Sequence, residues 1–446
     1  MEYAYLGRSG LKVSRLCLGT MTFGDAQAGC ADEAACHAIL DAYVAAGGNF
    51  IDTANTYHKG ESERIIGRWL AKNPALRSRL VIATKVRQPV DGSTAGPNDL
   101  GLSRAHIMAA VEESLARLQT PYIDLYQCHL WDAGTPVEET LRALDDLVRA
   151  GKVRYTGWSN VSGWQLMKIL AVSRAAGYAA PLSLQVQYSL LCRATEYELT
   201  EVCASEGVGL LPWSGLKGGW LTGKMVRGVG APEGSRVAEV EKSGKPMQSH
   251  PTYSQFAEDE AVWGLLAGLG ELAAELRCAV PAVALRWLLQ KPSVPSLVIG
   301  CRTLEQLQGN LQACAVALSP AHMARLDALS ARPVPYRALR PAAGGAAHPS
   351  APPSLCSLPL ATRARPHSTH ATRSLRDDHA RERAAEEVED EESPVPKPLC
   401  SPMGLSLRLR GARACGEEPS GPQWGRHLLL RVPHAHALGT NTQRLV

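Results

Sequence analysis

Short apolar runs recur about every 30 residues along the first 336 positions, separated by stretches with an apolar residue every three or four positions. Several of the runs are almost continuously apolar, which is typical of parallel strands covered by helices. The runs predict eight strands, at residues 16–20, 49–53, 80–86, 123–130, 153–158, 182–188, 209–213 and 296–300.

The stretches between the strands have the periodicity of amphipathic helices. The apolar positions of residues 107–118 fall on one helical face, and so do those of residues 137–148. Asp32 and Ser103 stand where helix N-caps are expected. Strands that alternate with helices predict right-handed βαβ units. Eight such units favour a closed (β/α)₈ TIM barrel, and an open doubly wound α/β sheet is the alternative.

Two segments stand outside this repeat. Residues 3–14 predict a hairpin with Gly7 and Gly10 in its turn, which would plug one end of the barrel. Residues 221–258, after the seventh strand, form a long connection rich in Gly, Ser, Lys and Pro. Connections of this length in compact domains are usually functional lids or disordered.

The regular pattern ends near residue 336. Beyond it Pro, Ala, Gly and Arg dominate, and an acidic run spans Glu386–Glu392. Such a composition buries too little apolar surface to offset the entropy of ordering the chain. We therefore predict a barrel domain at residues 1–335 and a low-complexity, disordered tail at residues 336–446, with a small second domain as the alternative.

The composition, 45% hydrophobic and 20% charged, is that of a soluble globular protein. A net charge of +4 is too small to imply a nucleic-acid partner. No apolar run approaches the roughly 20 residues that membrane insertion needs, and no secretory signal or other address is visible, so a cytoplasmic location is expected. The 12 cysteines are scattered without metal-ligand spacing, so no metal site is expected.

The C-terminal strand ends of a barrel form its active face, so polar residues at those ends are the candidates for chemistry. Asp52 ends the second strand and Tyr57 lies in the loop after it, while Lys85 ends the third strand and His129 the fourth. Because the three strands are neighbours, we expect these four side chains to converge.

The four side chains suit the reduction of a carbonyl group, which needs a hydride at carbon and a proton at oxygen. A tyrosine hydroxyl supplies the proton, and a lysine ammonium beside it is expected to lower its pKa from the usual value of about 10. An aspartate holds the lysine, and a histidine hydrogen-bonds the substrate oxygen. Each residue taken singly has a structural alternative, such as an N-cap, a surface ion pair or a core histidine. Their joint position favours the chemistry.

The surrounding residues resemble those of the aldo-keto reductases. The matching segments are FIDTANTYHKGESERIIG, IATKV, DLYQCHLWD, GWSNVSGWQL, LLPWSGLKGGWLTGK and VIGCRTLEQLQGN, in the family's order across roughly residues 3–330. The resemblance implies the barrel, an NADPH/NADP⁺ cofactor, and Asp52, Tyr57, Lys85 and His129 as a catalytic tetrad. It is strongest to the subgroup of aryl-alcohol dehydrogenase-like reductases and potassium-channel β-subunits.

The resemblance also implies a cofactor site. Around the nicotinamide and its ribose it places Gly19, Thr20, Met21, Ser159, Asn160, Gln185 and Trp213. Around the pyrophosphate it places Ser214, Leu216, Gly218 and Lys224. At the adenosine end it places Gly300, Arg302, Thr303, Gln306 and Asn310. The Arg302 fork suits the 2′-phosphate of NADP.

Three aromatic residues on loops of the active face, Phe23, Trp131 and Tyr253, are expected to line an apolar mouth for a small-molecule carbonyl substrate. Three other positions depart from the family's pattern. Gly309 replaces the usual acidic residue, Gly215 a proline and Cys301 an alanine. These departures predict weaker cofactor binding with the chemistry intact.

The expected function is therefore NADP(H)-dependent reduction of an aldehyde or ketone, or alcohol oxidation in reverse, with Tyr57 as proton donor. The alternative is a cofactor-binding, redox-sensing regulatory subunit with little turnover. His129 favours the enzyme, because an asparagine at this position would favour the regulatory class. A homo-oligomer and a channel-like partner both stay open.

Overall fold

The computed structural model describes residues 1–24, 32–244 and 251–333. The predicted tail at residues 336–446 and the domain boundary at residue 335 lie outside them. All eight predicted strands are present and parallel: β3 Leu16–Gly19, β4 Phe50–Asp52, β5 Val81–Val86, β6 Ile123–Cys128, β7 Val153–Ser159, β8 Ser183–Gln187, β9 Gly209–Trp213 and β10 Leu297–Gly300. Neighbours follow the order β10-β3-β4-β5-β6-β7-β8-β9, and β9 also packs against β10. The sheet thus closes into the predicted barrel, and the open-sheet alternative is wrong.

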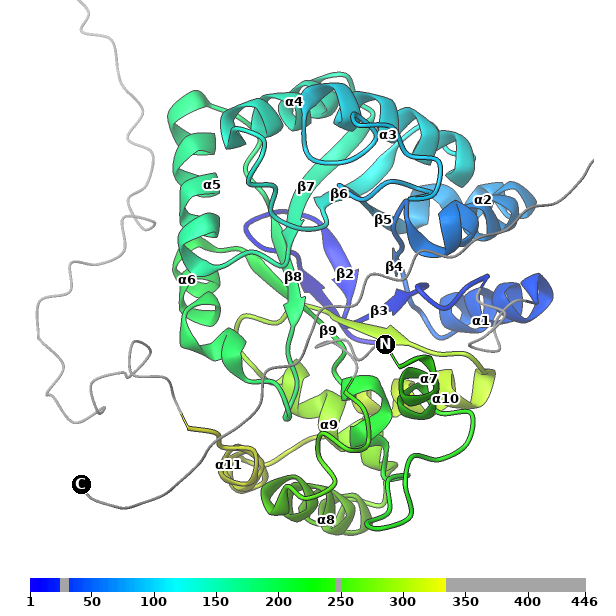
Figure 1. Ribbon diagram of the computed structural model, residues 1–446, viewed down its shortest axis with the longest axis vertical. Helices are drawn as coiled ribbons and strands as arrows, with labels where there is room; N and C mark the ends of the chain where they lie inside the picture. Colours follow the sequence, from blue (N-terminus) through cyan, green and yellow to red (C-terminus); the bar gives the residue numbers. More distant parts are fainter. Residues whose placement is uncertain (25–31, 245–250, 334–446) are drawn as a thin grey trace, which may run out of the picture. The chain divides into compact units, whose positions relative to one another are not determined.

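Helices form an outer ring around the strands (Figure 1). Those that cover the barrel wall are α1 Glu33–Ala45, α2 Glu61–Lys72, α3 Arg104–Leu118, α4 Val137–Arg149, α5 Gly163–Ala176, α6 Leu199–Glu206, α8 Glu260–Glu275, α9 Val280–Leu289, α10 Leu304–Leu311 and α11 Pro320–Leu329. The side chains of Asp32 and Ser103 accept hydrogen bonds from the backbone N–H groups of Ala34 and His106. Both predicted N-caps are therefore confirmed.

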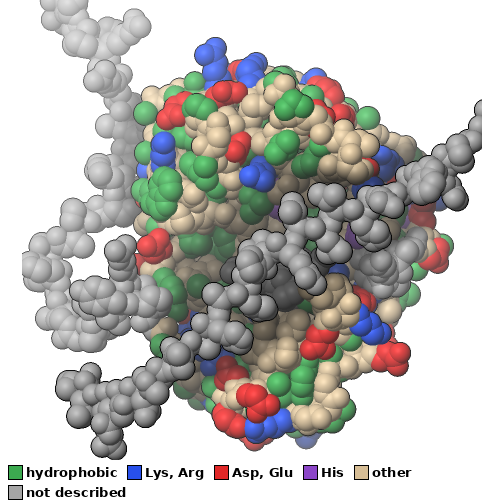
Figure 2. Space-filling view, in the orientation of Figure 1, with side chains coloured by type: hydrophobic (Ala, Val, Ile, Leu, Met, Phe, Trp, Pro, Cys, Tyr) green, Lys and Arg blue, Asp and Glu red, His purple; other side chains and the backbone are tan. Residues whose placement is uncertain are grey.

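Short 3₁₀ turns complete the described residues: η1 Tyr57–Gly60, η2 Pro74–Arg79, η3 Ala194–Tyr197, η4 Lys217–Thr222 and η5 Gln312–Cys314. On the face drawn in Figure 2, acidic and basic side chains are interspersed rather than gathered by sign. Surface ion pairs such as Arg104–Asp146, at 2.5 Å, belong to this mixed surface.

The predicted N-terminal hairpin is present, with β1 Tyr3–Tyr5 antiparallel to β2 Lys12–Ser14. Figure 1 shows it across the centre of the ring of strands. Its turn needs a glycine, because Gly7 has φ +55° and an added Cβ would lie 2.4 Å from a backbone oxygen. Leu6 and Val13 are fully buried and pack on the lowest layer of the barrel interior. The hairpin therefore closes the end of the barrel opposite the candidate active face.

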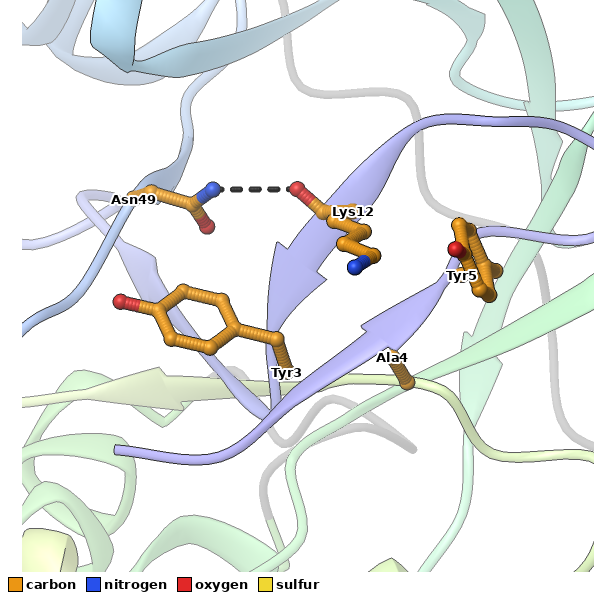
Figure 3. Close-up of a pocket in the computed structure, with 5 residues that line it drawn as sticks. All are labelled: Tyr3, Ala4, Tyr5, Lys12 and Asn49. Carbon is orange, nitrogen blue, oxygen red and sulfur yellow. Dashed lines mark hydrogen bonds between the residues drawn. The ribbon is translucent and has the colours of Figure 1, made fainter.

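Figure 3 shows a pocket formed by this hairpin, lined by Tyr3, Ala4, Tyr5, Lys12 and Asn49. The amide of Asn49 donates to the carbonyl of Lys12 over 3.0 Å. Asn49 directly precedes β4, so the pocket lies at the N-terminal ends of the strands. It is therefore separate from the strand ends that carry the candidate chemistry.

The barrel interior changes from apolar to polar along its axis. Phe50, Ala83, Leu125 and Leu211 form an apolar cluster with the hairpin residues. Side chains two residues further along a strand point the same way. The next inward positions after Phe50, Ala83 and Leu125 are Asp52, Lys85 and Gln127, all of them buried. The three polar side chains therefore form a layer directly above the apolar layer, toward the C-terminal ends of the strands.

The long connection at residues 221–258 differs from the prediction in one respect. It contains a two-turn helix, α7 Arg236–Ser243, whose N-cap Ser235 accepts from the N–H of Ala238. Residues 245–250 lie outside the described residues. Trp220 stacks on Tyr253 at 5.6 Å between ring centroids and meets the edges of Phe256 and Trp263. This aromatic cluster anchors the connection to the barrel.

Candidate active site

The barrel brings the side chains of Asp52, Tyr57 and Lys85 into one hydrogen-bonded chain. The ammonium Nζ of Lys85 lies 2.5 Å from Oδ1 of Asp52 and 3.2 Å from the Tyr57 hydroxyl oxygen. It also donates to the carbonyl of Thr53 over 2.8 Å. The ring of His129 stands nearly perpendicular to the Tyr57 ring, with 5.9 Å between centroids. The four side chains from three neighbouring strands and one loop therefore meet as expected.

Two glutamines hold the other oxygen of the Asp52 carboxylate. The side-chain amides of Gln127 on β6 and Gln185 on β8 donate to Oδ2 over 3.0 and 2.9 Å. Sequence reasoning missed Gln127 and assigned Gln185 to the cofactor. The available signal was a glutamine between the apolar residues Tyr126 and Cys128 on a buried strand, since such a side chain needs a polar partner.

Local backbone geometry places the Tyr57 hydroxyl. His58, Lys59 and Gly60 follow it with φ values of 47°, 55° and 82°, so the chain turns sharply between β4 and α2. An added Cβ on Gly60 would lie 2.8 Å from the Arg117 side chain. This close approach, together with the left-handed backbone, accounts for a glycine at the end of the turn.

Burial and neighbouring charges together set the pKa values of Lys85 and Tyr57. Burial opposes the Lys85 ammonium, but the Asp52 carboxylate and the Tyr57 oxygen outweigh it and raise the Lys85 pKa to about 12. Burial also raises the pKa of Tyr57 above its ordinary value, and Lys85 only partly offsets this. Lys85 acts on this pKa in the expected direction, but burial, which the sequence did not reveal, raises it by more. Tyr57 is held as the protonated phenol.

His129 is held in its neutral form. Burial, followed by the charges of Lys85 and Arg87, lowers its pKa to about 3. Its Nδ1 atom is buried and has no hydrogen-bond partner among the described residues. A neutral imidazole carries one N–H that can donate to an oxygen without adding charge to the site.

We expect His129 to make the protein less stable as pH falls. The unfolded histidine gains a proton near pH 6.5, whereas the folded one stays neutral down to about pH 3. Within that window a His129→Asn variant should gain stability relative to the parent by about 1.4 kcal/mol per pH unit. Urea unfolding of both proteins at several pH values measures this difference. A difference that does not change with pH would show that His129 is protonated in the fold.

Asn160 links the end of β9 to the backbone at His129. Its Oδ1 accepts from the indole N–H of Trp213 over 3.1 Å, and its Nδ2 donates to the His129 carbonyl over 3.0 Å and to the Ser159 hydroxyl. Ser159 in turn donates to the Gln185 carbonyl over 2.8 Å. These residues, which the sequence assigns to the cofactor, therefore form one connected rim beside Tyr57 and His129.

The loop after β9 turns sharply through residues with a left-handed backbone. Ser214, Lys217, Gly218 and Gly219 have φ values of 58°, 48°, 66° and 106°. Within the loop, the N–H groups of Lys217 and Gly219 donate to the carbonyls of Ser214 and Leu216 over 2.8 and 3.0 Å. Lys217 is buried in this loop, and burial lowers its pKa despite the opposing effect of Cys192. Sequence reasoning singled out Lys224 instead, which is exposed.

The neighbouring departure at Gly215 is closely packed. An added Cβ would lie 3.0 Å from Leu288 and 3.2 Å from both Leu285 and Leu297. Leu216 packs at the edge of the same core. A larger residue at this position would therefore need these leucine side chains to shift.

At the end of β10, the predicted adenosine residues are engaged with one another. Thr303 caps α10 by accepting from the Gln306 N–H, and the Gln306 side chain accepts from the Arg302 N–H over 2.9 Å. Asn310 is buried and donates to the Gly300 carbonyl over 3.3 Å. It therefore supports the end of the strand from behind.

Arg302 also reaches the long connection after β9. Its guanidinium donates to the Glu239 carboxylate of α7 over 2.9 Å and to the Gly234 carbonyl over 2.8 Å. A phosphate bound by Arg302 must exchange with this carboxylate.

At the end of β3, Thr20 is fully buried, and its hydroxyl bonds the Asp52 carbonyl and the Ser62 hydroxyl. Gly19 packs closely against Val298, whereas Met21 is 37% exposed and is the residue of this group that solvent reaches. Direct contact with a cofactor side group is therefore open to Met21 but not to the Thr20 hydroxyl.

Two of the three residues expected at the substrate mouth are elsewhere. Phe23 has no exposed surface and belongs to the main core. Tyr253 is buried against Trp220, and its hydroxyl donates to the Val226 carbonyl over 2.8 Å. Both assignments are therefore wrong, because packing, not position in a loop, decides where an aromatic ring points. Trp131 is partly exposed and contacts Trp158 and Trp164.

Comparisons with known proteins agree with this architecture. The sequence pattern of the Aldo/keto reductase family matches residues 15–331. The chain is 40% identical over 323 residues to "Uncharacterized oxidoreductase YrpG" of Bacillus subtilis, covering 71% of this chain and 92% of that protein. It is 35% identical over 319 residues to "Norsolorinic acid reductase stcV" of Emericella nidulans, covering 70% and 76%.

A third relative is "Probable voltage-gated potassium channel subunit beta" of Oryza sativa, 33% identical over 333 residues that cover 74% of this chain and 96% of that protein. The chain therefore belongs to the aldo/keto reductase family of oxidoreductases, and the predicted resemblance is confirmed. Members of this family generally use nicotinamide cofactors. Within the described part of the chain, no helix is both long and apolar enough to span a membrane.

Proposed function

We propose that the protein is an NADP(H)-dependent carbonyl reductase with Asp52, Tyr57, Lys85 and His129 as its catalytic residues. The observation that carries this proposal is the chain of contacts from Asp52 through Lys85 to the Tyr57 hydroxyl, beside a neutral His129. It combines a protonated phenol with a fixed positive charge and an uncharged N–H donor at one strand-end site.

In the proposed reaction a bound nicotinamide supplies the hydride to the carbonyl carbon. Tyr57 gives its hydroxyl proton to the carbonyl oxygen, which becomes the hydroxyl oxygen of the alcohol. The Lys85 ammonium stabilises the tyrosinate that results, and Asp52 holds that ammonium in place. His129 donates its N–H to the oxygen as negative charge develops there.

Several features of the chain suit a dinucleotide. Trp213 ends β9, and its flat indole suits stacking on a nicotinamide ring. Lys217 in the loop that follows supplies a positive charge for a pyrophosphate. Arg302 suits a 2′-phosphate once that group displaces Glu239. NADPH is therefore proposed as the preferred cofactor over NADH.

The test is to mix the purified protein with NADPH or NADH and a panel of aromatic and aliphatic aldehydes and quinones, and to follow nicotinamide absorbance. Faster consumption of NADPH than of NADH supports the proposal. Equal affinity for the two cofactors would contradict the role of Arg302. No consumption with any carbonyl would contradict the reductase itself.

The similarity to a protein named as a potassium channel subunit supports a second candidate, a cofactor-binding regulatory subunit with little turnover. This reading predicts that NADPH quenches the protein's tryptophan fluorescence although no carbonyl is reduced. Turnover at the rates of ordinary reductases would exclude it.

We expect Gly309→Glu to tighten NADPH binding by up to about tenfold, because it restores an acceptor at the adenine end of the proposed site. The position has room, since no atom lies within 4 Å of an added Cβ. Gly309→Ala is the matched control. It should raise the free energy of unfolding by up to about 1 kcal/mol without changing affinity. Equal gains in affinity from both variants would show that helix stability, not the acceptor, is responsible.

A further inference from the structure

Arg87 directly follows β5, two residues after Lys85. Its φ of 138° is a conformation that residues with a side chain rarely adopt. Its carbonyl accepts from the Gly101 N–H over 2.8 Å, which fixes this backbone. The guanidinium is therefore mounted on a strained but anchored residue at the edge of the candidate active site.

The charge of Arg87 reaches two residues at that edge. It contributes to the lowered pKa of His129 after burial and Lys85. At Asp132 burial raises the pKa, but hydrogen bonds from Thr135, Leu102 and Gly134 and, last, the charge of Arg87 outweigh it and lower the pKa. Asp132 makes no ion pair with Arg87 in the described residues. Its carboxylate accepts instead from the N–H groups of Leu102 and Gly134 and from the Thr135 hydroxyl.

Arg87 lacks a partner of its own among the residues that the structure describes. Its Nε atom is buried without a hydrogen bond, and no ion pair joins it to a carboxylate of that part of the chain. Other cations of the same face are paired, as in Lys59–Asp91 at 2.9 Å and Arg302–Glu239 at 2.9 Å. An unpaired buried donor costs free energy that a ligand can recover.

We propose that Arg87 binds a carboxylate carried by the carbonyl substrate, so that this site prefers aldehydes or ketones bearing an acid group. The planar guanidinium matches a carboxylate through two parallel N–H bonds. Trp131, two residues after His129, is partly exposed and suits the apolar part of such a substrate. This inference rests on the proposed reductase function and names its substrate class.

The experiment compares 3- and 4-carboxybenzaldehyde with their methyl esters, which differ from them in charge, at saturating NADPH. The parent should show a kcat/KM at least tenfold higher for one of the acids than for its ester. Arg87→Gln should raise KM for that acid by about 10- to 100-fold and so abolish the preference. Arg87→Lys should keep part of it, because the charge remains but the fork is lost.

The matched control is Arg142→Gln, which removes one charge from an exposed position on α4 and should leave the acid-to-ester ratio unchanged. Reduction of acid and ester with equal kcat/KM, unaffected by Arg87→Gln, would overturn the inference and leave the reductase standing. A rise in KM for NADPH rather than for the acid would assign Arg87 to the cofactor and also overturn it.

If the parent protein reduces neither the acids nor the esters, the proposed reductase function is contradicted. The anion site is then measured directly. Calorimetric titration of the NADP⁺-loaded protein with benzoate reports binding without turnover. Weaker benzoate binding by Arg87→Gln than by Arg142→Gln supports the anion site, and equal binding refutes it.

Discussion

Tyr57→Phe is expected to lower kcat/KM for carbonyl reduction by about 10²- to 10⁴-fold, the range in which general acid catalysis operates. The change removes one oxygen atom, the only group of this side chain that Lys85 contacts by a hydrogen bond in the described residues. The loss should fall on kcat, because the proton moves in the transition state. Nicotinamide absorbance in steady state measures it.

The affinity for NADPH should change little in this variant, and fluorescence titration checks this. Tyr3→Phe is the matched control, since it removes a hydroxyl bonded to the Gly47 carbonyl at the opposite end of the barrel. Turnover by Tyr57→Phe within tenfold of the parent would contradict the assigned proton donor and leave another group to be found.

Lys85→Met is expected to abolish turnover and to lower the free energy of unfolding by about 3–5 kcal/mol, the usual cost of breaking a buried ion pair. Lys85 has no exposed surface and Asp52 only 2%, so the remaining carboxylate would lack a counter-charge. Two glutamine amides would still contact it, but neither carries charge. Urea unfolding, beside the reductase assay, measures both effects.

The double variant Asp52→Asn with Lys85→Met separates stability from chemistry. Removing both charges leaves no unpaired charge at this position, so most of the lost stability should return. Turnover should not return, because no ammonium stands beside Tyr57. A double variant as unstable as the single one would show that packing around the methionine, not the unpaired carboxylate, causes the loss.

The four catalytic candidates were accessible from sequence because each lies at or just after a predicted strand end, and neighbouring strands bring such ends together. The role of Gln127 could not be predicted, because nothing near it in the sequence reveals that its partner is Asp52, 75 residues away. Lys217 and Arg87 were missed for a similar reason. A lysine or arginine beside a strand is ordinary in sequence, and only its burial or its lack of a partner makes it notable.

The errors have one physical origin. Phe23 and Tyr253 lie in loops, and a loop aromatic has the same sequence signature whether it faces a ligand or the core. The Tyr57 pKa was expected below its usual value from the nearby ammonium, but burial acts in the opposite sense and is larger. Burial is a sum over the whole surroundings of a group, and no local pattern contains it.

By itself the sequence determined the order and kind of the elements, the helix caps and the residues at the strand ends, because these follow from spacings within a few residues. The tertiary structure decided which groups pair, which are buried and what charge they carry. Examples are the contacts of Asp52 with Gln185 and of Arg302 with Glu239, and the lack of a partner for Arg87 among the described residues. Those properties depend on distances through space between segments far apart in the chain, which only the closed barrel sets.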